Sequence, residues 1–174
     1  MDILFAPPDL RRIDALQCEA CWFPFFSDER PLRGVLGLVD WRMGARLSRQ
    51  ILRGRLRGRR GEVLLMPCER FLPFEKLFLC GLGRRAEFDD AAYTEAVESM
   101  LSTFQSARIR AAVCALPGRT TGAIEPEPAI TSLLACARNY SGYEELTILD
   151  EPGAQRAMEP VIAQERRRER AEPA

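Results

Sequence analysis

The sequence has 174 residues, 47% of them hydrophobic, and its 25 basic residues equal its 25 acidic residues. This length fits a single domain with its own hydrophobic core, and the balanced charge excludes an overall field that would define a partner. No apolar run approaches the roughly 20 residues that span a bilayer, and Asp2 stands where a signal peptide would carry basic charge.

Six short apolar segments, bounded by proline, glycine or charged residues, are predicted to be strands. Several are too apolar for a sheet with one wet face, and helical patterns lie between them. We therefore expect an α/β fold in which helices cover both faces of a mixed, mostly parallel sheet of about six strands. The predicted strands span residues 3–5, 15–23, 63–66, 76–80, 111–116 and 145–149.

The first two predicted helices each show an apolar stripe. Between residues 36 and 53 apolar side chains recur at steps of three and four, and Gly54 then provides a stop. The next helix begins behind Asp89, a favourable N-cap, and buries positions from Tyr93 to Phe104. Both patterns indicate helices that pack on the sheet.

Two further helices are expected toward the C-terminus. Pro128 suits the first turn of one helix, which should end near residues 141–142. The last helix is interrupted by Pro160 and closes in the charged run 164–170, which lacks an apolar face. We expect this run to be a solvated helix end or a disordered tail.

The six cysteines are irregularly spaced, and most lie in apolar stretches, which is typical of buried thiols in a reducing compartment. We therefore expect a cytoplasmic protein. Cys18 and Cys21 form a Cys-x-x-Cys pattern, but a redox pair normally opens a helix, whereas these two lie in a predicted strand. Side chains three apart on a strand point to opposite faces, so we interpret both as structural cysteines.

Two segments carry motifs in a recognisable order. One runs from Gly54 to Pro67, ends in Gly-Glu-Val-Leu-Leu-Met-Pro and follows the helix that Pro-Leu-Arg-Gly at 31–34 introduces. The other runs from Glu75 to Asp89, where a strand leads through Gly-Leu-Gly-Arg-Arg to a helix start. Over roughly residues 12 to 150 the chain thus resembles the N-terminal domain of leucyl aminopeptidases, the M17 peptidase family.

The resemblance implies a three-layer α/β/α domain with a macro-domain-like fold, which we assign to residues 1–150, followed by a C-terminal helix and charged tail at 151–174. It also implies that the family's peptidase chemistry belongs to a larger C-terminal domain, which holds two divalent metals and carries an Asn-Thr-Asp-Ala-x-Gly-Arg signature. That signature does not occur in this sequence. The resemblance therefore does not extend peptidase activity to this chain.

No residue pattern indicates a catalytic or metal centre. The sequence contains no histidine, which is the commonest general base and metal ligand. Paired carboxylates occur at 89–90, 125–127 and 144–145, where helix capping and solvation explain them. We therefore predict no catalytic residue, no metal site and no cofactor.

A Gly-x-Gly turn formed by Gly81 and Gly83 follows one predicted strand and precedes a helix, where backbone N–H groups could hold a phosphate. The positive charges of Arg84 and Arg85 would help to hold the phosphate. The pattern is only a partial Gly-x-Gly motif, and the two aspartates that open the next helix would repel a phosphate. A nucleotide or ADP-ribose site at this turn is therefore one alternative.

Eight arginines and no acid occur from Arg42 to Arg60. On one continuous helix, steps of three and four would place several of them in a ridge that could neutralise nucleic-acid phosphates or an acidic protein surface. The other interpretation is a solvated face in an arginine-rich protein, because stacking aromatic residues are not interleaved with the arginines. The candidate residues are Arg42, Arg46, Arg49, Arg53 and Arg57.

Trp22 and Phe25 belong to a dense aromatic cluster around Pro24. Such a cluster usually belongs to a core, here a strand end beneath the first long helix. If part of it is exposed, it would form a protein-binding patch. Both interpretations stay open at this point.

We therefore interpret the chain as a non-catalytic binding or regulatory module that acts through a protein partner and can associate with itself. One alternative is a nucleic-acid-binding accessory protein that uses the arginines from 42 to 60, because some leucyl aminopeptidases bind DNA. The other is a nucleotide or ADP-ribose binder at Gly81–Arg85. None of these interpretations involves a membrane.

Overall fold

Strands and helices alternate along the chain. The computed structural model describes residues 1–68 and 70–171, apart from the side chain of residue 169. The strands are β1 (Asp2–Ala6), β2 (Ala20–Phe25), β3 (Val63–Pro67), β4 (Lys76–Gly81), β5 (Ala111–Cys114) and β6 (Glu145–Leu149). The α-helices are α1 (Leu10–Ala15), α2 (Gly34–Arg42), α3 (Arg46–Leu52), α4 (Asp90–Ser106), α5 (Pro126–Ala137) and α6 (Pro152–Ala171), with 3-10 turns η1 (Arg85–Glu87) and η2 (Arg119–Thr121).

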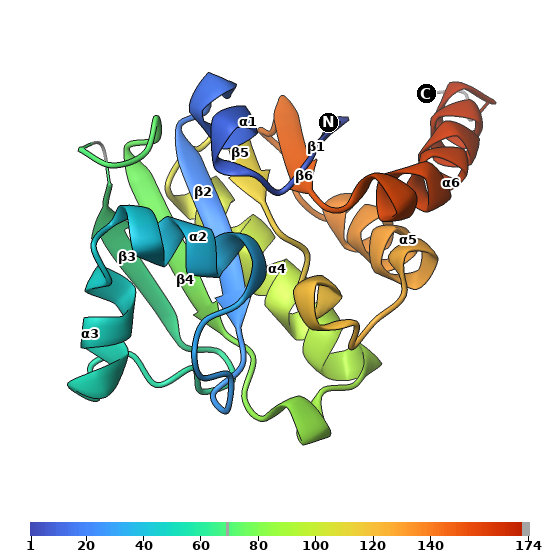
Figure 1. The fold of residues 1–174 in the computed structure, drawn as a ribbon. Helices are drawn as coiled ribbons and strands as arrows, with labels where there is room; N and C mark the ends of the chain where they lie inside the picture. Colours follow the sequence, from blue (N-terminus) through green and yellow to red (C-terminus); the bar gives the residue numbers. More distant parts are fainter. Residues whose placement is uncertain (69, 172–174) are drawn as a thin grey trace.

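The six described strands form one sheet in the order β1-β6-β5-β2-β4-β3 (Figure 1). Every neighbouring pair is parallel except β3 and β4. Parallel neighbours need a crossover, which α5 supplies between β5 and β6, whereas the short connection between β3 and β4 permits an antiparallel pair. The predicted α/β fold with a mixed, mostly parallel sheet is confirmed.

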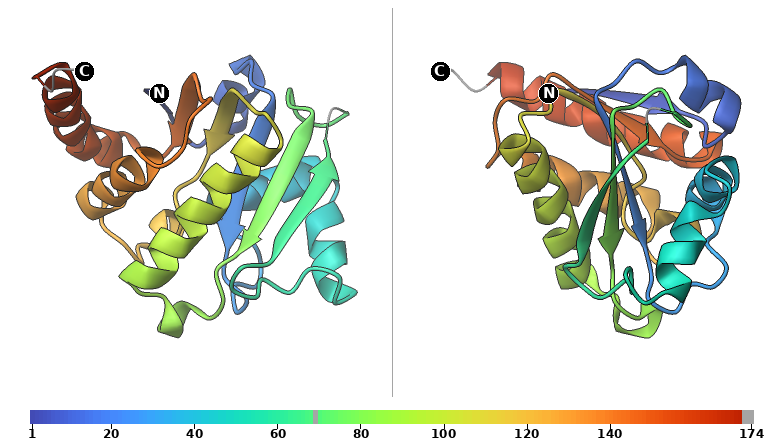
Figure 2. Two further views of the ribbon diagram at one scale, coloured as in Figure 1. Left: turned by 180° about the vertical axis from the view of Figure 1, so that it is seen from behind. Right: turned by 90° about the vertical axis from the view of Figure 1, so that its left-hand side faces the viewer.

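Helices cover both faces of the sheet (Figure 2). α1, α2 and α3 pack on one face against side chains such as Phe23 and Leu79, and α4, α5 and α6 pack on the other face against Trp22 and Phe78. Neighbouring residues of a strand point to opposite faces, so Trp22 and Phe23 lie in different cores. Trp22 packs edge-on against Phe104 of α4, with ring centroids 5.8 Å apart.

The helix predicted over residues 36–53 is two helices, so the prediction of one continuous helix is wrong. The chain turns at residues 44–45, which are both left-handed, with φ of 61° and 59°. The carboxylate of Asp40 accepts hydrogen bonds from the backbone N–H groups of Leu47 at 2.8 Å and Ser48 at 3.2 Å. A side chain of α2 therefore caps the N-terminus of α3 and stabilises the break.

The strand predicted over residues 15–23 begins later than predicted. Residues 10–15 form α1, whose N-cap Asp9 accepts a hydrogen bond from the backbone N–H of Arg12 at 2.9 Å. β2 begins at Ala20. The prediction is wrong at its first five positions because α1 buries only Ile13 and is too short to show an apolar stripe.

The predictions for α4 and α5 agree with the structure in their starts. The side chain of Asp89 accepts a hydrogen bond from the backbone N–H of Ala92 at 2.8 Å, so it is the N-cap of α4 as predicted. α5 begins at Pro126, and Pro128 lies in its first turn. α5 ends earlier than predicted, before residues 141–142.

α6 is continuous although Pro160 lies inside it. Its charged end is not wholly solvated, because the carboxylate of Glu165 is buried and pairs with Arg138 at the end of α5. Residues 172–174 of the predicted tail lie outside the described residues. Within the described part of the chain, each helix is too short or too polar to cross a membrane.

Candidate functional site

β2 and β5 separate at their carboxyl ends. The carbonyl of Trp22 accepts a hydrogen bond from the N–H of Ala115 at 3.1 Å, and the pairing of the two strands stops there. Pro24 is the next β2 residue that faces β5, and it has no N–H with which to extend the pairing. The chain leaves β2 toward α2 on one face and leaves β5 toward α5 on the other. This is a topological switch point, where open α/β sheets hold ligands.

A pocket of about 660 Å³ opens at this edge of the sheet. Its walls come from the chain after β1 at Pro8, the loop after β5 at Arg119 and Thr120, and the end of β6 at Asp150. The first turns of α2, α5 and α6 complete it. The carboxyl ends of parallel strands meet at one edge, so segments distant in sequence lie together here. The pocket has the size of an ordinary ligand site, about 300–1,000 Å³, and is the candidate functional site.

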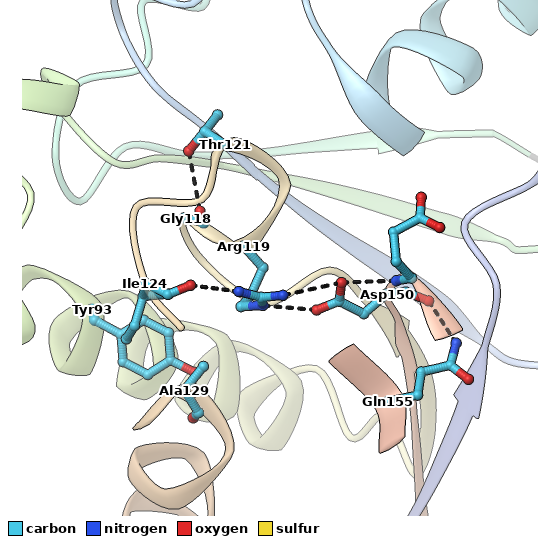
Figure 3. A network of polar contacts seen from close by, with 9 residues as sticks. Tyr93, Gly118, Arg119, Thr121, Ile124, Ala129, Asp150 and Gln155 are labelled. Atoms are coloured by element: carbon cyan, nitrogen blue, oxygen red, sulfur yellow. Dashed lines mark hydrogen bonds and ion pairs between the residues drawn. The ribbon is translucent and has the colours of Figure 1, made fainter. Parts of the chain in front are cut away.

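A buried ion pair forms one wall of the pocket (Figure 3). Nε of Arg119 donates to Oδ2 of Asp150 at 2.9 Å, and the two side chains are only 12% and 9% exposed. Arg119 also donates to the carbonyl of Ile124 at 2.5 Å, and Asp150 accepts from the N–H of Glu151 at 2.8 Å. The pair thus fixes the loop after β5 to the start of α6. Removing one partner of such a buried pair costs about 3–5 kcal/mol.

The loop after β5 is also held against the start of α2. Gly34 has a φ of +55°, and a Cβ at this position would lie 2.1 Å from Cγ2 of Thr120. Only glycine accepts both the left-handed backbone and the close approach. Contacts within the chain therefore hold the loop between α2 and α6.

The lining of the pocket is acidic. Glu125 and Glu151 line it, and neither forms an ion pair with a described side chain. Arg119 balances the charge of Asp150, so the two glutamates leave a net negative charge. Such a lining repels phosphate and favours a cationic or neutral group. Among the described residues, no three histidine, cysteine, aspartate or glutamate side chains are placed to hold a metal ion.

Beside the pocket, α2 exposes large apolar side chains. Leu38 lines the pocket and is 39% exposed. Trp41 lies three residues further along the same helix face and is 74% exposed. An exposed tryptophan next to a cavity is typical of a surface that contacts another protein.

The sequence of this domain matches a known family. Residues 23–141, more than half of the chain, match the cytosol aminopeptidase family, N-terminal domain. The chain belongs to the cytosol aminopeptidase family. It is similar to a probable cytosol aminopeptidase of Idiomarina loihiensis, with 30% identity over 100 residues that cover 58% of this chain and 20% of that protein. The chain therefore spans about a fifth of the length of this relative.

Solved structures share the fold of this member of the cytosol aminopeptidase family. A tomato leucine aminopeptidase mutant superposes with a TM-score of 0.63 at 17% identity, over 91% of this chain and 35% of that one. A Trypanosoma brucei macrodomain in complex with ADP-ribose superposes with a TM-score of 0.72 at 17% identity, over 92% of this chain and 68% of that one. At these identities the likeness shows the fold alone. The macro-domain-like, three-layer α/β/α fold is thus confirmed.

The Gly-x-Gly turn selected from the sequence does not line the pocket. The N–H groups of Gly81 and Gly83 donate to backbone carbonyls at 2.8 Å and 2.9 Å, and that of Arg85 donates to the carboxylate of Asp28 at 3.1 Å. Arg84 is exposed beside them. These three N–H groups therefore have no free hydrogen to offer a phosphate in this conformation.

The arginines from 42 to 60 do not form one straight ridge, because the predicted helix is broken at residues 44–45. Four of the five candidates already have partners inside the chain, but only the ion pair of Arg42 with Asp14 offsets positive charge that nucleic acid would need. Binding of nucleic acid stays a prediction. Arg42 pairs with Asp14, Arg46 lies 4.5 Å from the ring centroid of Phe71, Arg49 and Arg57 donate to backbone carbonyls, and Arg53 is the exposed C-cap of α3.

Trp22 and Phe25 are core residues. Trp22 is 0% exposed and Phe25 is 1% exposed. Neither side chain can contact a partner, so the hypothesis of an exposed aromatic patch at these positions is wrong. Leu38 and Trp41 are exposed apolar residues that lie at or beside the pocket.

The Cys-x-x-Cys thiols are protonated at neutral pH. Burial, with the nearby charges of Glu145 and Glu19, raises the pKa of Cys18 to about 11. Burial and the neighbouring Cys68 raise the pKa of Cys21 well above its ordinary value. Reactive cysteines have a lowered pKa, so both thiols are suited to packing and not to redox chemistry.

The sequence reasoning missed Arg119 and Asp150. Arg119 lies in Pro-Gly-Arg-Thr-Thr-Gly at 117–122, which follows the strand predicted at 111–116 and precedes a helix. The same arrangement of strand, glycine turn and helix made residues 81–85 a candidate site. Asp150 directly follows another predicted strand, but only the order of strands in the sheet shows that the two side chains meet.

Proposed function

We propose that this chain is a non-catalytic binding module that engages a protein partner through the pocket at the carboxyl edge of the sheet and the adjoining face of α2. The observation that carries this proposal is the exposure of Trp41 and Leu38 beside a pocket. Burying the largely exposed side chain of Trp41 in a partner gains about 1.5–3 kcal/mol, and burying the remaining exposed part of Leu38 gains less. Tryptophan is also among the residues most enriched at the energetic centres of interfaces.

The chemistry of the side chains supports a role without catalysis. Activating water or a nucleophile needs a base of suitable pKa or a metal cage. The sequence has no histidine, and the buried thiols have raised pKa values. Arg119 and Asp150 neutralise each other in a pair that acts as a support for the pocket wall.

The charge of the pocket indicates the character of the partner. Glu125 and Glu151 make the lining negative, while Leu38, Pro126 and Leu149 make it apolar. An apolar segment with a lysine or arginine side chain complements both features. We therefore propose that the partner inserts such a segment, with an apolar side chain beside Trp41.

The test compares surface variants in affinity capture from native lysate. The expected result is one reproducible partner on the wild-type chain and at least about tenfold less of it on Trp41→Ala and Leu38→Ser. Leu52→Ser is the matched control, because Leu52 is 84% exposed on α3 and does not line the pocket. Equal capture by all four proteins would refute this surface.

A direct assay tests the absence of catalysis. The purified chain is incubated with leucine p-nitroanilide and with Mn²⁺ or Zn²⁺, and release of p-nitroaniline is followed. We expect no rate above the protein-free blank. A metal-dependent rate that co-elutes with the homogeneous chain would show that the module is an enzyme.

A nucleotide ligand is the second candidate, because the pocket lies where open α/β sheets hold ligands and one structural relative was solved with ADP-ribose. The acidic lining disfavours its diphosphate. Thermal unfolding with millimolar ADP-ribose separates the two candidates, because a ligand that binds the folded chain raises Tm by mass action. A saturable rise in Tm would favour the nucleotide, and a flat response would refute it.

A further inference from the structure

The outer edge of β1 is not paired with any described strand, because β1 joins the sheet only through β6. The N–H of Asp2 donates to the carbonyl of Glu144, and the carbonyl of Ala6 accepts from Asp150. Alternate residues of a strand form backbone hydrogen bonds with the same neighbouring strand. The bonds of Asp2 and Ala6 therefore show that the even-numbered residues of β1 face β6. The backbone N–H and C=O groups of Ile3 and Phe5 therefore point away from the sheet.

A groove of about 580 Å³ runs beside this free edge. β1 forms one wall, and one face of α6 forms the other, because the contributing α6 residues recur at steps of three and four from Gln155 to Arg170. β1 spans about 17 Å at roughly 3.3 Å per residue. The groove thus follows a backbone edge long enough to pair with a strand.

The charges in the groove are arranged along its length. Arg166 reaches Asp2 at 3.4 Å, so the C-terminal half of α6 lies beside the beginning of β1. Arg167 and Arg170 line the same end, and neither has a carboxylate partner among the described side chains. Glu159 is on the earlier part of α6 and is, among the described side chains, the only acidic residue of this helix that lines the groove.

The two faces of β1 offer different surroundings to an added strand. Ile3 and Phe5 point toward the core that α4, α5 and α6 cover, and the arginines of α6 stand on that side. Leu4 points to the opposite face and is 45% exposed. A strand beside β1 would therefore place alternate side chains next to arginines and next to an apolar surface.

We infer that this groove binds an extended acidic segment of a partner protein, which pairs with β1 as a seventh strand. The backbone of this segment forms hydrogen bonds with the free N–H and C=O groups of Ile3 and Phe5. Its carboxylates lie against Arg167 and Arg170, and its alternate apolar side chains pack beside Leu4. This site shares no lining residue with the pocket at the carboxyl edge, so it stands independently of the proposed function.

The test uses a fluorescein-labelled peptide of alternating valine and glutamate, six residues long, with the full chain. Fluorescence anisotropy should show saturable binding that is at least about tenfold tighter than for the valine and lysine peptide. Added salt should weaken it. Hydrogen exchange at the N–H groups of Ile3 and Phe5 should slow in the complex, which a purely electrostatic contact would not produce.

Two variants of α6 locate the site. Arg167→Glu with Arg170→Glu should weaken binding at least about tenfold. Arg156→Glu is the matched control, because Arg156 is exposed on the same helix and does not line the groove. Circular dichroism confirms that both variants are folded.

Three results would overturn the inference. They are equal binding of the two peptides, equal loss in Arg156→Glu, or no change in exchange at Ile3 and Phe5. Sedimentation as a dimer that the peptide cannot dissociate would assign the edge to a second copy of the chain instead.

Discussion

Thr147 is a buried polar side chain whose hydroxyl has no hydrogen-bond partner among the described residues. It lies in β6 between Leu4 of β1 and Val113 of β5, and it is 2% exposed. A buried hydroxyl without a partner costs about 1–3 kcal/mol. The unpaired hydroxyl of Thr147 therefore lowers the stability of the folded protein.

We expect Thr147→Val to stabilise the protein, because valine keeps the shape and the β-branch while it removes the hydroxyl. The gain should be about 1 kcal/mol, which raises Tm by roughly 2–4 °C for a chain of this size. Differential scanning calorimetry measures it. In the control Thr131→Val, the lost hydroxyl is exposed and donates to a helix carbonyl, so little change is expected. A lower Tm for Thr147→Val would show that the hydroxyl is satisfied.

Residue roles could be predicted where they depend on local sequence. Asp89 was identified as an N-cap because the cap bonds lie within three residues of it. The roles of Trp22 and Arg119 depend on strands that are distant in sequence. Burial of Trp22 requires α4 above it, and the partner of Arg119 is 31 residues away.

At the scale of elements, the packing of α2 on the loop after β5 depends on Gly34. We expect Gly34→Ala to destabilise the protein by more than the roughly 1–2 kcal/mol that a left-handed alanine costs. The added Cβ would also collide with Thr120. Urea unfolding measures the difference.

Gly122→Ala is the matched control for this prediction. Gly122 has a φ of +66°, but nothing lies within 4 Å of its added Cβ. It should therefore show the backbone cost alone. Equal losses in the two variants would mean that α2 moves away from Thr120 without cost.

Elements with long apolar stripes could be predicted, and elements defined by short-range breaks could not. α4 has seven buried residues at helical spacing, so its pattern was unambiguous. The break between α2 and α3 interrupts a stripe that itself continues through Met43 and Leu47. It depends on the Asp40 side chain, whose capping role periodicity does not reveal.

For the whole molecule, buried thiols link stability to alkaline pH. Burial raises the pKa of Cys18 from 9.0 to about 11 and that of Cys80 from 9.0 to about 12. Above pH 9 the unfolded chain loses these protons while the folded chain keeps them. The contribution of the protonated thiols to the free energy of unfolding is therefore complete below pH 9. It is lost as pH rises from 9 through the folded pKa values.

We predict that, above pH 9, the free energy of unfolding of Cys80→Ala falls less steeply with pH than that of the wild type. The deeply buried Cys80 thiol contributes up to about 1.4 kcal/mol per pH unit between its two pKa values. Urea midpoints of wild type and variant at pH 8, 9, 10 and 11 measure the slopes. Parallel slopes would show that Cys80 ionises equally in both states. The comparison of slopes is independent of any constant loss from the smaller side chain.

The site as a whole could be predicted only in part. Turns after strands could be found from glycines, and residues 81–85 and 117–122 share that pattern. Which of these turns borders the pocket at the carboxyl edge depends on the order of the strands in the sheet. That order could not be predicted from the sequence. The acidic lining likewise combines Glu125, which precedes α5, with Glu151, which follows β6.

The two tryptophans of the chain occupy opposite environments, since Trp22 is fully enclosed and Trp41 is 74% exposed. Their indole emission should therefore contain a blue component from the interior and a red component that acrylamide quenches. Trp41→Phe isolates the interior component and so provides a clean optical record of unfolding. The difference between wild type and this variant isolates the surface indole. Contact at α2 can thus be followed in solution without attaching any dye.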